Sequence, residues 1–321
     1  IMKNILIIGS GAMGAAFTIP CLDNNHKVTL CEPYNRELIK KMLSKKNFHP
    51  TLKINLPRKL VVKNFSQEIL KKKWDLIVIA VSSIGIDLIR EKLKHLKNNC
   101  PILVLTKGLK YEKKLKRIIT MSEQLNQGNR KFNLSVLKGP CLAVELAKKT
   151  KTSVVIANKN TKISKSIGKL ISTNYYKTDY STDVRGVEIC SAIKNIYSII
   201  IGAGEGLNAS SSIFRKSISE MVYITKFFKG KENTVYGLAG IGDLYVSALG
   251  GRNSRMGKYL GKGFTFKKAK NKFMPNDTIE GAQLAFEIAP YILKKINNKK
   301  IPLMVDLLKA ISKNKKLNIR W

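Results

Sequence analysis

A lysine and an asparagine stand in the middle of a segment that is otherwise almost entirely apolar. The stretch "EICSAIKNIYSIII" (residues 188–201) is typical of a buried helix, and Lys194 and Asn195 lie near its centre. Burying an ammonium group is costly unless the group is paired or used in chemistry. Lys194 is therefore a candidate for acid–base or electrostatic work. The alternative is a lysine that reaches solvent along a polar stripe of the helix. That stripe consists of Glu188, Ser191 and Ser198.

A glycine motif lies close to the start of the sequence. The letters G-S-G-A-M-G (residues 9–14) directly follow an apolar run and open a helical stretch. In such a motif the first glycine makes a tight turn, the second lets a pyrophosphate approach the backbone, and the third lets the helix pack on the strand. The helix amino terminus then faces the phosphates. The motif predicts a dinucleotide cofactor, and the alternative is a glycine-rich turn of another α/β protein. The predicted cofactor-binding residues of this turn are Gly9, Gly11, Ala12, Met13 and Gly14.

An acidic residue ends the next predicted strand. Glu32 follows "KVTLC" and stands where a carboxylate can bind the 2′-hydroxyl of a ribose. The same carboxylate repels a 2′-phosphate; Arg36 lies nearby and could offset this repulsion, but it lies further into the loop. We therefore predict a preference for NAD(H), with NADP(H) as the alternative cofactor.

Three further stretches place polar residues beside glycine. "TKGL" follows a strand, so Lys107 lies at a carboxyl end, where ligands bind in parallel sheets. "KGPCLAVELA" (residues 138–147) follows another strand, and its Gly-Pro pair forms a turn that exposes backbone. "AGIGDLYVSALGGRNSRMG" (residues 239–257) brings Asp243, Arg252 and Asn253 into a glycine-rich region. Taken singly, each charged residue here also fits an ordinary surface role.

The elements that must position these residues change in kind along the chain. The first half alternates short β-rich runs with helical stretches such as residues 84–96, and the runs are apolar almost throughout. This pattern is typical of a doubly wound parallel sheet buried on both faces. The predicted strands cover residues 3–9, 27–31, 76–81, 102–106, 134–137 and 153–157.

The second half lacks strand patterns and is predicted to be mainly helical. A polar, turn-prone stretch at residues 178–186 separates the halves. We therefore expect an α/β protein, with a Rossmann dinucleotide-binding domain over residues 1–185 and a helical substrate domain over residues 186–321. The predicted helices cover residues 187–201, 213–228, 279–294 and 303–313, with a glycine-rich turn region at 237–242.

The composition argues against several classes of protein. Fifty-nine basic and 21 acidic residues give a formal net charge of +38, but the lysines scatter along the chain without a nucleic-acid module signature. We expect no specific nucleic-acid partner, and the positive field should help to draw in a small anionic substrate. The five cysteines show no C-x-x-C spacing and the three histidines no metal-binding spacing, which predicts reduced thiols and no metal site.

The apolar runs are also too short to cross a bilayer, which needs about 20 residues. No secretory signal is visible, because the first apolar stretch is interrupted by glycines. We therefore expect a cytoplasmic protein without a membrane span.

Taken together, the motifs resemble those of the cytosolic NAD(P)-dependent sn-glycerol-3-phosphate dehydrogenases. They occur in the order found in that family and cover most of the chain, and as a set they are highly specific. The resemblance implies reversible reduction of dihydroxyacetone phosphate to sn-glycerol 3-phosphate, which supplies glycerophospholipid synthesis, and it implies a homodimer. The motifs that carry it are G-S-G-A-M-G, "TKGL", "GPCLAVE", "GVEICSAIKN", "GAGEGLN", "LAGIGDL", "GGRN" and "TIEGA".

The resemblance also implies a role for each matching residue. Lys194 corresponds to the catalytic acid or base, Asp243 to the carboxylate that pairs with it, and Lys107 to a lysine that contacts substrate and cofactor. We expect the two ammonium groups to act on one carbonyl group. The remaining matches are Asn195, Gly251, Arg252 and Asn253 for substrate and its phosphate, Gly139 and Ala143 for substrate and cofactor, and Arg252 and Glu280 for the cofactor.

The chemistry of these residue types agrees with the implied reaction. Hydride transfer to a ketone creates an alkoxide, which needs a proton donor and a positive charge nearby. With few histidines in the chain, a lysine must supply both. Desolvation would lower the pKa of Lys194, and Asp243 would raise it again and hold the side chain in place. Arginine and asparagine supply donors suited to phosphate.

Three positions depart from the family pattern and bear on the exact substrate, and two alternatives to the implied reaction stay open. Cys141 stands where a hydroxyl or amide side chain is usual, Ser191 replaces a small glycine, and the serines at 210–212 replace a basic residue, although Arg215 follows. One alternative is a sister reductase of another small phosphorylated or carboxylated ketone. The other, of a different class, is a basic nucleic-acid-binding protein on a Rossmann scaffold.

Overall fold

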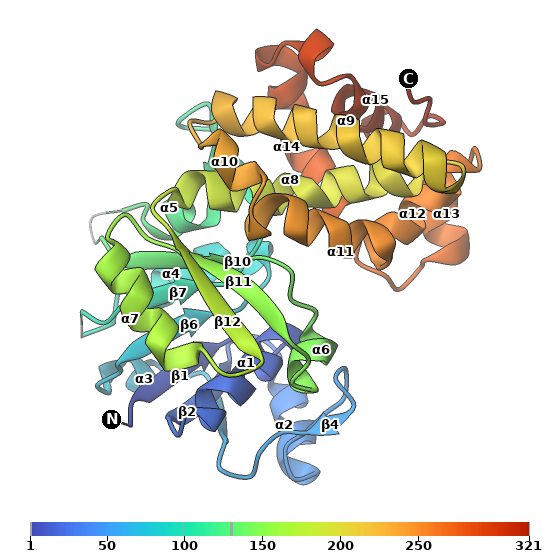
Figure 1. The fold of residues 1–321 in the computed structure, drawn as a ribbon. Coiled ribbons are helices and arrows are strands. Elements are labelled where there is room, and N and C mark those ends of the chain that lie inside the picture. The colour runs from blue at the N-terminus through green and yellow to red at the C-terminus, as the bar shows by residue number, and fades with distance from the viewer. Residues whose placement is uncertain (1, 98, 129–130, 321) are drawn as a thin grey trace. The chain divides into compact units, whose positions relative to one another are not determined.

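The computed structural model describes residues 2–97, 99–128 and 131–320 (Figure 1). The chain divides into two compact units. The first comprises Ile1–Lys107 and Met121–Val184, and the second comprises Gly108–Thr120 and Arg185–Trp321. A short segment from the first half of the sequence therefore belongs to the second unit.

The first unit is built on an eight-stranded sheet in the order β12-β11-β10-β7-β6-β1-β2-β5. All neighbouring strands run parallel except β10 and β11, which pair antiparallel. The order reverses between β1 and β6, which is where doubly wound sheets bind their ligands. The strands are β1 (Asn4–Ile8), β2 (Lys27–Glu32), β5 (Val61–Asn64), β6 (Leu76–Ile79), β7 (Ile102–Val104), β10 (Leu134–Lys138), β11 (Thr152–Ala157) and β12 (Tyr176–Ser181).

The six predicted strands are confirmed, and two edge strands are new. β12 runs through the stretch that was predicted to be a turn-prone boundary, and β5 lies at the opposite edge of the sheet. Five of the six residues of β12 are exposed or half-buried, as is common for a strand at the edge of a sheet. Its pattern is therefore polar, although Tyr176 is fully buried.

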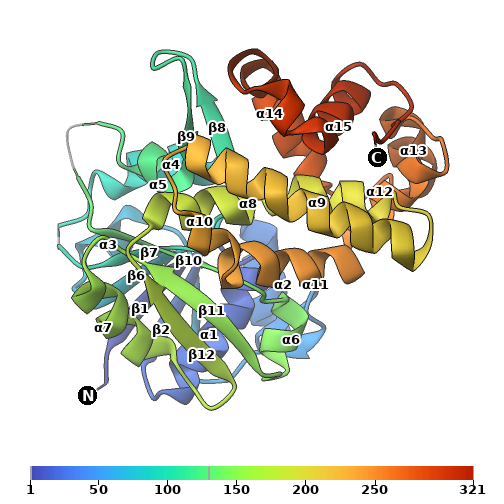
Figure 2. The same cartoon turned by 45° about the horizontal axis from the view of Figure 1, so that its top comes forward.

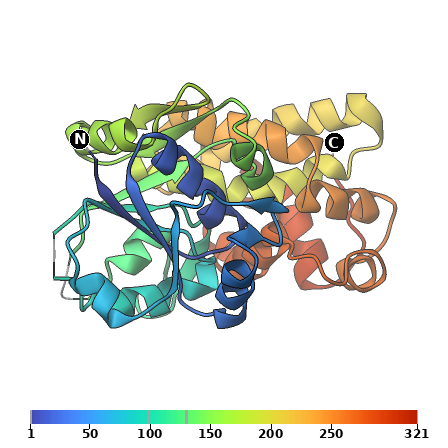
Figure 3. The same cartoon turned by 90° about the horizontal axis from the view of Figure 1, so that it is seen from below.

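Helices cover both faces of this sheet, as the view from below shows (Figure 3). α1 contacts α6 and α7, and α4 contacts α5, so the helices form two groups. The helices of this unit are α1 (Ala12–Asp23), α2 (Arg36–Ser44), α3 (Gln67–Lys71), η1 (Ser83–Gly85), α4 (Ile86–Leu93), α5 (Met121–Leu125), α6 (Ala143–Ala147) and α7 (Thr161–Ile171), and a small hairpin consists of β3 (Phe48–His49) and β4 (Ile54–Asn55).

The second unit is helical, as predicted. No strand occurs among the described residues after Ser181. The four predicted long helices are confirmed as α8, α9, α14 and α15. The helices of this unit are α8 (Val184–Gly202), α9 (Gly206–Phe227), α10 (Glu232–Val235), η2 (Leu238–Gly242), α11 (Asp243–Leu249), α12 (Arg252–Gly261), α13 (Phe266–Phe273), α14 (Glu280–Lys295), η3 (Asn298–Lys300) and α15 (Pro302–Ser312).

Helix α8 is the core of this unit, and every residue from Gly186 to Ile201 is buried. Two glycines let neighbouring helices approach its backbone. A Cβ atom on Gly257 of α12 would lie 2.0 Å from the carbonyl oxygen of Ile199, and one on Gly281 of α14 would lie 2.3 Å from that of Asn195. Both helices therefore pack directly against the part of α8 that carries Lys194 and Asn195.

A β-hairpin also belongs to the second unit. It consists of β8 (Leu109–Glu112) and β9 (Arg117–Thr120) and packs on α14 (Figure 2). The Tyr111 N–H donates to Glu287 Oε1 at 2.8 Å, and the rings of Tyr111 and Tyr291 lie 6.0 Å apart. Across the described residues, no helix combines the length and apolar character needed to cross a membrane.

Candidate active site

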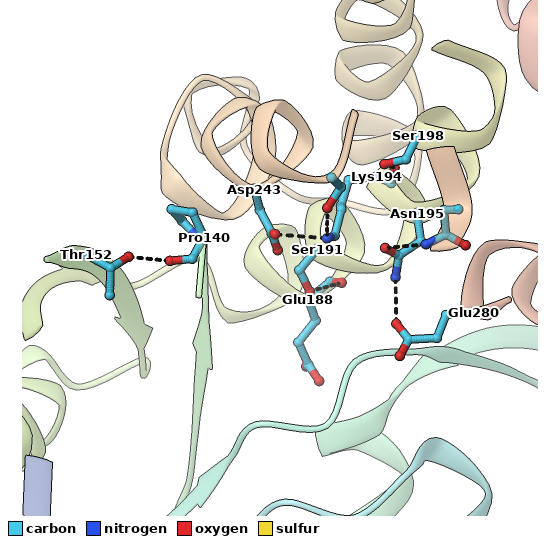
Figure 4. Close-up of polar contacts among 11 residues, drawn as sticks. Pro140, Thr152, Glu188, Ser191, Lys194, Asn195, Ser198, Asp243 and Glu280 are labelled. Atoms are coloured by element: carbon cyan, nitrogen blue, oxygen red, sulfur yellow. Dashed lines mark hydrogen bonds and ion pairs between the residues drawn. The ribbon is translucent and has the colours of Figure 1, made fainter. Parts of the chain in front are cut away.

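Lys194 is buried and paired. The residue is 5% exposed, and its Nζ lies 2.8 Å from Oδ1 of Asp243 (Figure 4). Asp243 is itself only 3% exposed. The Lys194 ammonium also donates to Oγ of Ser247, one turn further along α11. The lysine predicted from the pattern of α8 and the carboxylate predicted from the glycine-rich region therefore meet.

The polar stripe around Lys194 does not lead to solvent. Glu188, Ser191 and Ser198 are each 2% exposed or less. Ser191 donates to the carbonyl of Glu188, and Ser198 donates to the carbonyl of Lys194, so both hydroxyls satisfy backbone groups of α8. The interpretation of Lys194 as a residue that reaches solvent along this stripe is wrong.

Asp243 is presented by an unusual turn. The five residues Leu238–Gly242 form a π-helical turn that continues into α11, and such turns frequently occur at functional sites. Gly240 is required there, because a Cβ atom would lie 2.1 Å from the carbonyl oxygen of Val235. Asp243 is the first residue of α11, and Ser247 lies on the same face four residues later.

Asn195 belongs to a second group of polar contacts beside the ion pair. Its Nδ2 donates to Oε2 of Glu280 at 3.3 Å, and its Oδ1 accepts from Nδ2 of Asn253 at 3.1 Å. Oδ1 of Asn253 in turn accepts from the N–H of Gly281 at 2.9 Å. The amide oxygens and nitrogens are oriented by these contacts, so α8, α12 and α14 are joined by side chains predicted to bind substrate or cofactor.

The amino terminus of α12 carries the predicted phosphate-binding residues. Gly251 has a φ of 93°, which favours glycine, and Arg252 and Asn253 open the helix. One guanidinium nitrogen of Arg252 lies 3.5 Å from Oε1 of Glu280, and both side chains are about half exposed. This pair is weak in water and leaves the guanidinium accessible to an anion. The helix terminus adds backbone N–H groups and a positive dipole.

In the first unit, the glycine turn shows the close approaches expected of the motif. Gly9 has a φ of 111°, and a Cβ atom on Gly14 would lie 1.9 Å from the carbonyl oxygen of Gly9. A Cβ atom on Gly11 would meet nothing within 4 Å. Among the described residues, no steric contact requires a glycine at position 11, which is consistent with the cofactor-binding role predicted for Gly11. Ala12 and Met13 form the first turn of α1 behind this position.

Glu32 contacts the glycine turn directly. Its Oε2 accepts from the N–H of Ser10 at 2.9 Å and from the Ser10 hydroxyl at 2.6 Å. Its Oε1 accepts from the N–H groups of Tyr34 and Asn35 at 2.9 and 3.1 Å. The carboxylate thus binds the glycine turn to the loop after β2, a role that the sequence did not predict.

A histidine fixes the other side of the same turn. Nε2 of His49 lies 2.9 Å from the carbonyl oxygen of Ser10, and Nδ1 accepts from the N–H of Leu52 at 3.2 Å. The ring therefore carries its proton on Nε2, and burial lowers the pKa of His49. We conclude that a neutral histidine holds the β3–β4 hairpin against the cofactor turn.

Two more predicted positions lie at carboxyl ends of strands in the first unit. Lys107 follows β7 and is half-buried, and the next residue, Gly108, has a φ of 148°. Gly139 follows β10 with a φ of 129°, and Ala143 begins the short helix α6. These ends lie on the ligand-binding edge of a parallel sheet.

Four residues in or beside the predicted site were not predicted: Ser10 and Ser247 contact predicted site residues, Lys138 binds the backbone just before Lys107, and His49 binds Ser10. Ser247 had a signal, since it lies four residues after Asp243 on one helix. Lys138 lies in a stretch that was singled out, but its side chain was given no role. Ser10 and His49 had no signal, because the contact of Ser10 with Glu32 and that of His49 with Ser10 form only when β2 and the β3–β4 hairpin pack beside the glycine turn.

A glycine turn after the first strand of a doubly wound sheet, with a buried lysine–carboxylate pair in a helical unit, defines a nicotinamide-dependent dehydrogenase. Comparison with known proteins specifies the family. The model described as "NAD-dependent glycerol-3-phosphate dehydrogenase N-terminus" matches residues 4–164, and the corresponding C-terminus model matches residues 183–319. The chain belongs to the NAD-dependent glycerol-3-phosphate dehydrogenase family.

Individual relatives agree across nearly the whole chain. The NADP(+)-dependent glycerol-3-phosphate dehydrogenase of Archaeoglobus fulgidus is 29% identical over 308 residues, covering 91% of this chain and 90% of that protein. The glycerol-3-phosphate dehydrogenase [NAD(P)+] of Leptospira biflexa is 30% identical over 287 residues, covering 86% and 84%. The crystal structure of glycerol-3-phosphate dehydrogenase from Coxiella burnetii is 26% identical with a TM-score of 0.85, covering 98% and 96%.

Proposed function

We propose that this protein reduces dihydroxyacetone phosphate to sn-glycerol 3-phosphate, reversibly, and so supplies glycerophospholipid synthesis. The observation that carries the proposal is the buried contact of 2.8 Å between Lys194 and Asp243, in a chain that belongs to this family. We assign the pyrophosphate of the cofactor to the first unit and the proton donor Lys194 to the second.

Lys194 is the proton donor in this proposal. The bound nicotinamide supplies the hydride for the carbonyl carbon. As negative charge develops on the substrate oxygen, the ammonium of Lys194 stabilises it and transfers one proton to it. In the reverse direction the neutral amine takes the hydroxyl proton. Asp243 and Ser247 hold Nζ in place, and the carboxylate offsets the cost of burying the charge.

Substrate binding is assigned to the neighbouring group of contacts. Arg252, Gly251 and Asn253 at the amino terminus of α12 would bind the phosphate through the guanidinium fork and the N–H groups of the helix. Asn195, held by Glu280 and Asn253, would orient the substrate hydroxyl. From the first unit we assign Lys107 and Gly139 to the substrate.

Cofactor binding is assigned to the glycine turn and to four residues outside it. Gly9, Gly11 and Gly14, with Ala12 and Met13, would hold the pyrophosphate at the start of α1. Lys107, Ala143, Arg252 and Glu280 are the remaining assigned cofactor contacts.

We further propose that the enzyme prefers NAD(H). Glu32 places a carboxylate at the end of β2, beside the turn that binds the pyrophosphate, and a 2′-phosphate there would be repelled. A ribose hydroxyl could take over the bond that the Ser10 hydroxyl now donates to Oε2. The test compares kcat/KM for NADH and NADPH in the wild type and in Glu32→Ser. The wild type should favour NADH, and the variant should reduce or reverse that ratio; a wild-type preference for NADPH would contradict the proposal.

The direct test of the reaction is NADH oxidation with a small panel of ketones. Dihydroxyacetone phosphate should be the best substrate. Faster turnover of another phosphorylated or carboxylated ketone would favour the sister reductase instead. Tight RNA binding that falls steeply with salt, without turnover of any ketone, would favour the nucleic-acid-binding alternative.

We also infer a cytoplasmic homodimer from the family resemblance, and light scattering of the purified protein tests the dimer.

A further inference from the structure

A second buried lysine lies at the ligand-binding edge of the sheet. Lys138 is the last residue of β10 and is only 1% exposed. An ammonium group at this depth is unfavourable unless hydrogen bonds replace the water that it loses. The proposed reaction gives it no role, so its contacts need a separate account.

Three consecutive carbonyl groups accept hydrogen bonds from this ammonium. Nζ of Lys138 lies 3.2 Å from the oxygen of Val104, 3.1 Å from that of Leu105 and 2.6 Å from that of Thr106. Val104 is the last residue of β7 and is also the last to pair with β10. The lysine therefore binds the backbone of β7 at the point where the regular ladder between the two strands ends.

The same segment is fixed from its other side. The N–H of Leu105 donates to the carbonyl oxygen of Ile79 at 2.9 Å, and the Thr106 hydroxyl donates to that of Val81 at 2.8 Å. β6 and the residues after it thus hold the strand end from one side, and Lys138 holds it from the other. The residue that follows this fixed segment is Lys107.

We propose that Lys138 is a positioning residue for Lys107. It fixes the carbonyl group of Thr106, which is joined directly to the backbone nitrogen of Lys107, and so sets the direction in which Lys107 leaves the sheet. Its buried charge also balances the carbonyl dipoles that converge at this point. This inference rests on the proposed function, in which Lys107 contacts the substrate.

The test is a double-mutant cycle with Lys107→Ala, Lys138→Met and the combined variant. Methionine keeps most of the volume of the lysine side chain and removes its hydrogen bonds and charge. In the wild-type background, Lys138→Met should lower kcat/KM for dihydroxyacetone phosphate by about 10- to 100-fold, as small displacements of a binding group do. In the Lys107→Ala background the same change should cost less than about twofold, because there is no longer an ammonium to position.

The outcomes separate this inference from the proposed function. If Lys107→Ala alone leaves kcat/KM unchanged, the substrate role of Lys107 is wrong and the positioning role falls with it. If Lys107→Ala lowers kcat/KM but Lys138→Met costs the same factor in both backgrounds, Lys138 only stabilises the unit and the inference is overturned.

One variant serves as a control. Lys159→Met, at an exposed position of the same unit, should leave kcat/KM unchanged.

A second variant replaces Lys138→Met if that protein is not soluble. Lys138→Gln keeps a hydrogen-bond donor without the charge and goes through the same cycle. It should show a smaller loss than about tenfold, again only when Lys107 is present. A loss of similar size in the Lys107→Ala background would overturn the inference.

Discussion

At the scale of single residues, burial distinguishes Lys194 from the many exposed lysines of this chain. The same lysine on a surface would be one of many in this chain, but here it is 5% exposed and in contact with Asp243. A buried ion pair is costly to form and costly to break, since removing one partner leaves the other uncompensated. Such a pair fits a site that needs a fixed positive charge.

The first prediction concerns the carboxylate. Asp243→Asn keeps the shape of the side chain but removes its charge, so the Lys194 ammonium loses its counter-ion. We expect kcat/KM to fall by about 100-fold and the free energy of unfolding to fall by roughly 3–5 kcal/mol. Steady-state kinetics and urea denaturation measure the two effects. Ser247→Ala, which removes only a neutral acceptor, should have a clearly smaller effect on both, and an unchanged kcat/KM in Asp243→Asn would contradict the role given to that carboxylate.

The predictability of single residues depended on their surroundings in sequence. Lys194 could be recognised because it interrupts an apolar helix pattern, and Asp243 because it follows glycines. Lys138 could not, because a lysine at a strand end in a lysine-rich chain carries no signal of burial. The contacts of Glu32 with Ser10 were equally hidden, since they form between the end of β2 and the glycine turn, 22 residues apart in sequence.

At the scale of elements, one buried carboxylate joins three helices of the second unit. Glu220 of α9 accepts from the N–H groups of Leu303 and Met304 at the start of α15, at 2.7 and 3.0 Å. It also accepts from the hydroxyl of Tyr197 in α8 at 2.9 Å. Burial raises the pKa of Glu220 to about 6, although these donated bonds act in the opposite direction.

The pH dependence follows from that shift. A carboxyl group whose pKa is raised in the folded state binds its proton more readily there, so its contribution to stability is present below about pH 4.5 and is lost as pH rises through about 6. We expect the free energy of unfolding of the wild type, relative to Glu220→Gln, to fall by about 2 kcal/mol across this window. Urea denaturation of both proteins at several pH values measures it. A difference that stays constant would show that the donated bonds balance burial, and one that grows with pH would show that they outweigh it; either result would contradict the prediction.

Elements with a regular pattern were predictable, and those shaped by their neighbours were not. The apolar strands β1 and β6 and the long helices α8 and α14 follow from periodicity alone. β12 was hidden because an edge strand is polar, and the β8–β9 hairpin because its partner is a helix more than 150 residues away. The π-helical turn before Asp243 depends on the close approach of Gly240 to Val235, which no local pattern shows.

At the scale of the whole molecule, charge is the most unusual property. A formal net charge of +38 produces a positive field that attracts anionic substrates and is screened by salt. The proposed substrate and cofactor are both anionic, so we expect the positive field to attract them to the enzyme. The fold class and the family were predictable at this scale, since many individually weak motifs occur in the order found in that family.

The field leads to a kinetic prediction. At saturating NADH, kcat/KM for dihydroxyacetone phosphate should fall at least about threefold when ionic strength rises from roughly 0.02 to 0.5 M, because screening weakens attraction at a distance. The value of kcat should change little. Dihydroxyacetone, which lacks the phosphate, should show a much weaker dependence under the same conditions. Equal salt effects on the two ketones would mean that the field does not guide the substrate.

The most direct test of the account is the turnover of Lys194→Ala with NADH and dihydroxyacetone phosphate. Because Lys194 is assigned as the group that protonates the substrate oxygen, its loss should lower kcat by at least about 1000-fold. NADH binding, measured by fluorescence titration, should remain within about threefold of the wild type and would also show that the first unit is folded. Turnover close to the wild-type rate in a folded variant would contradict the central claim.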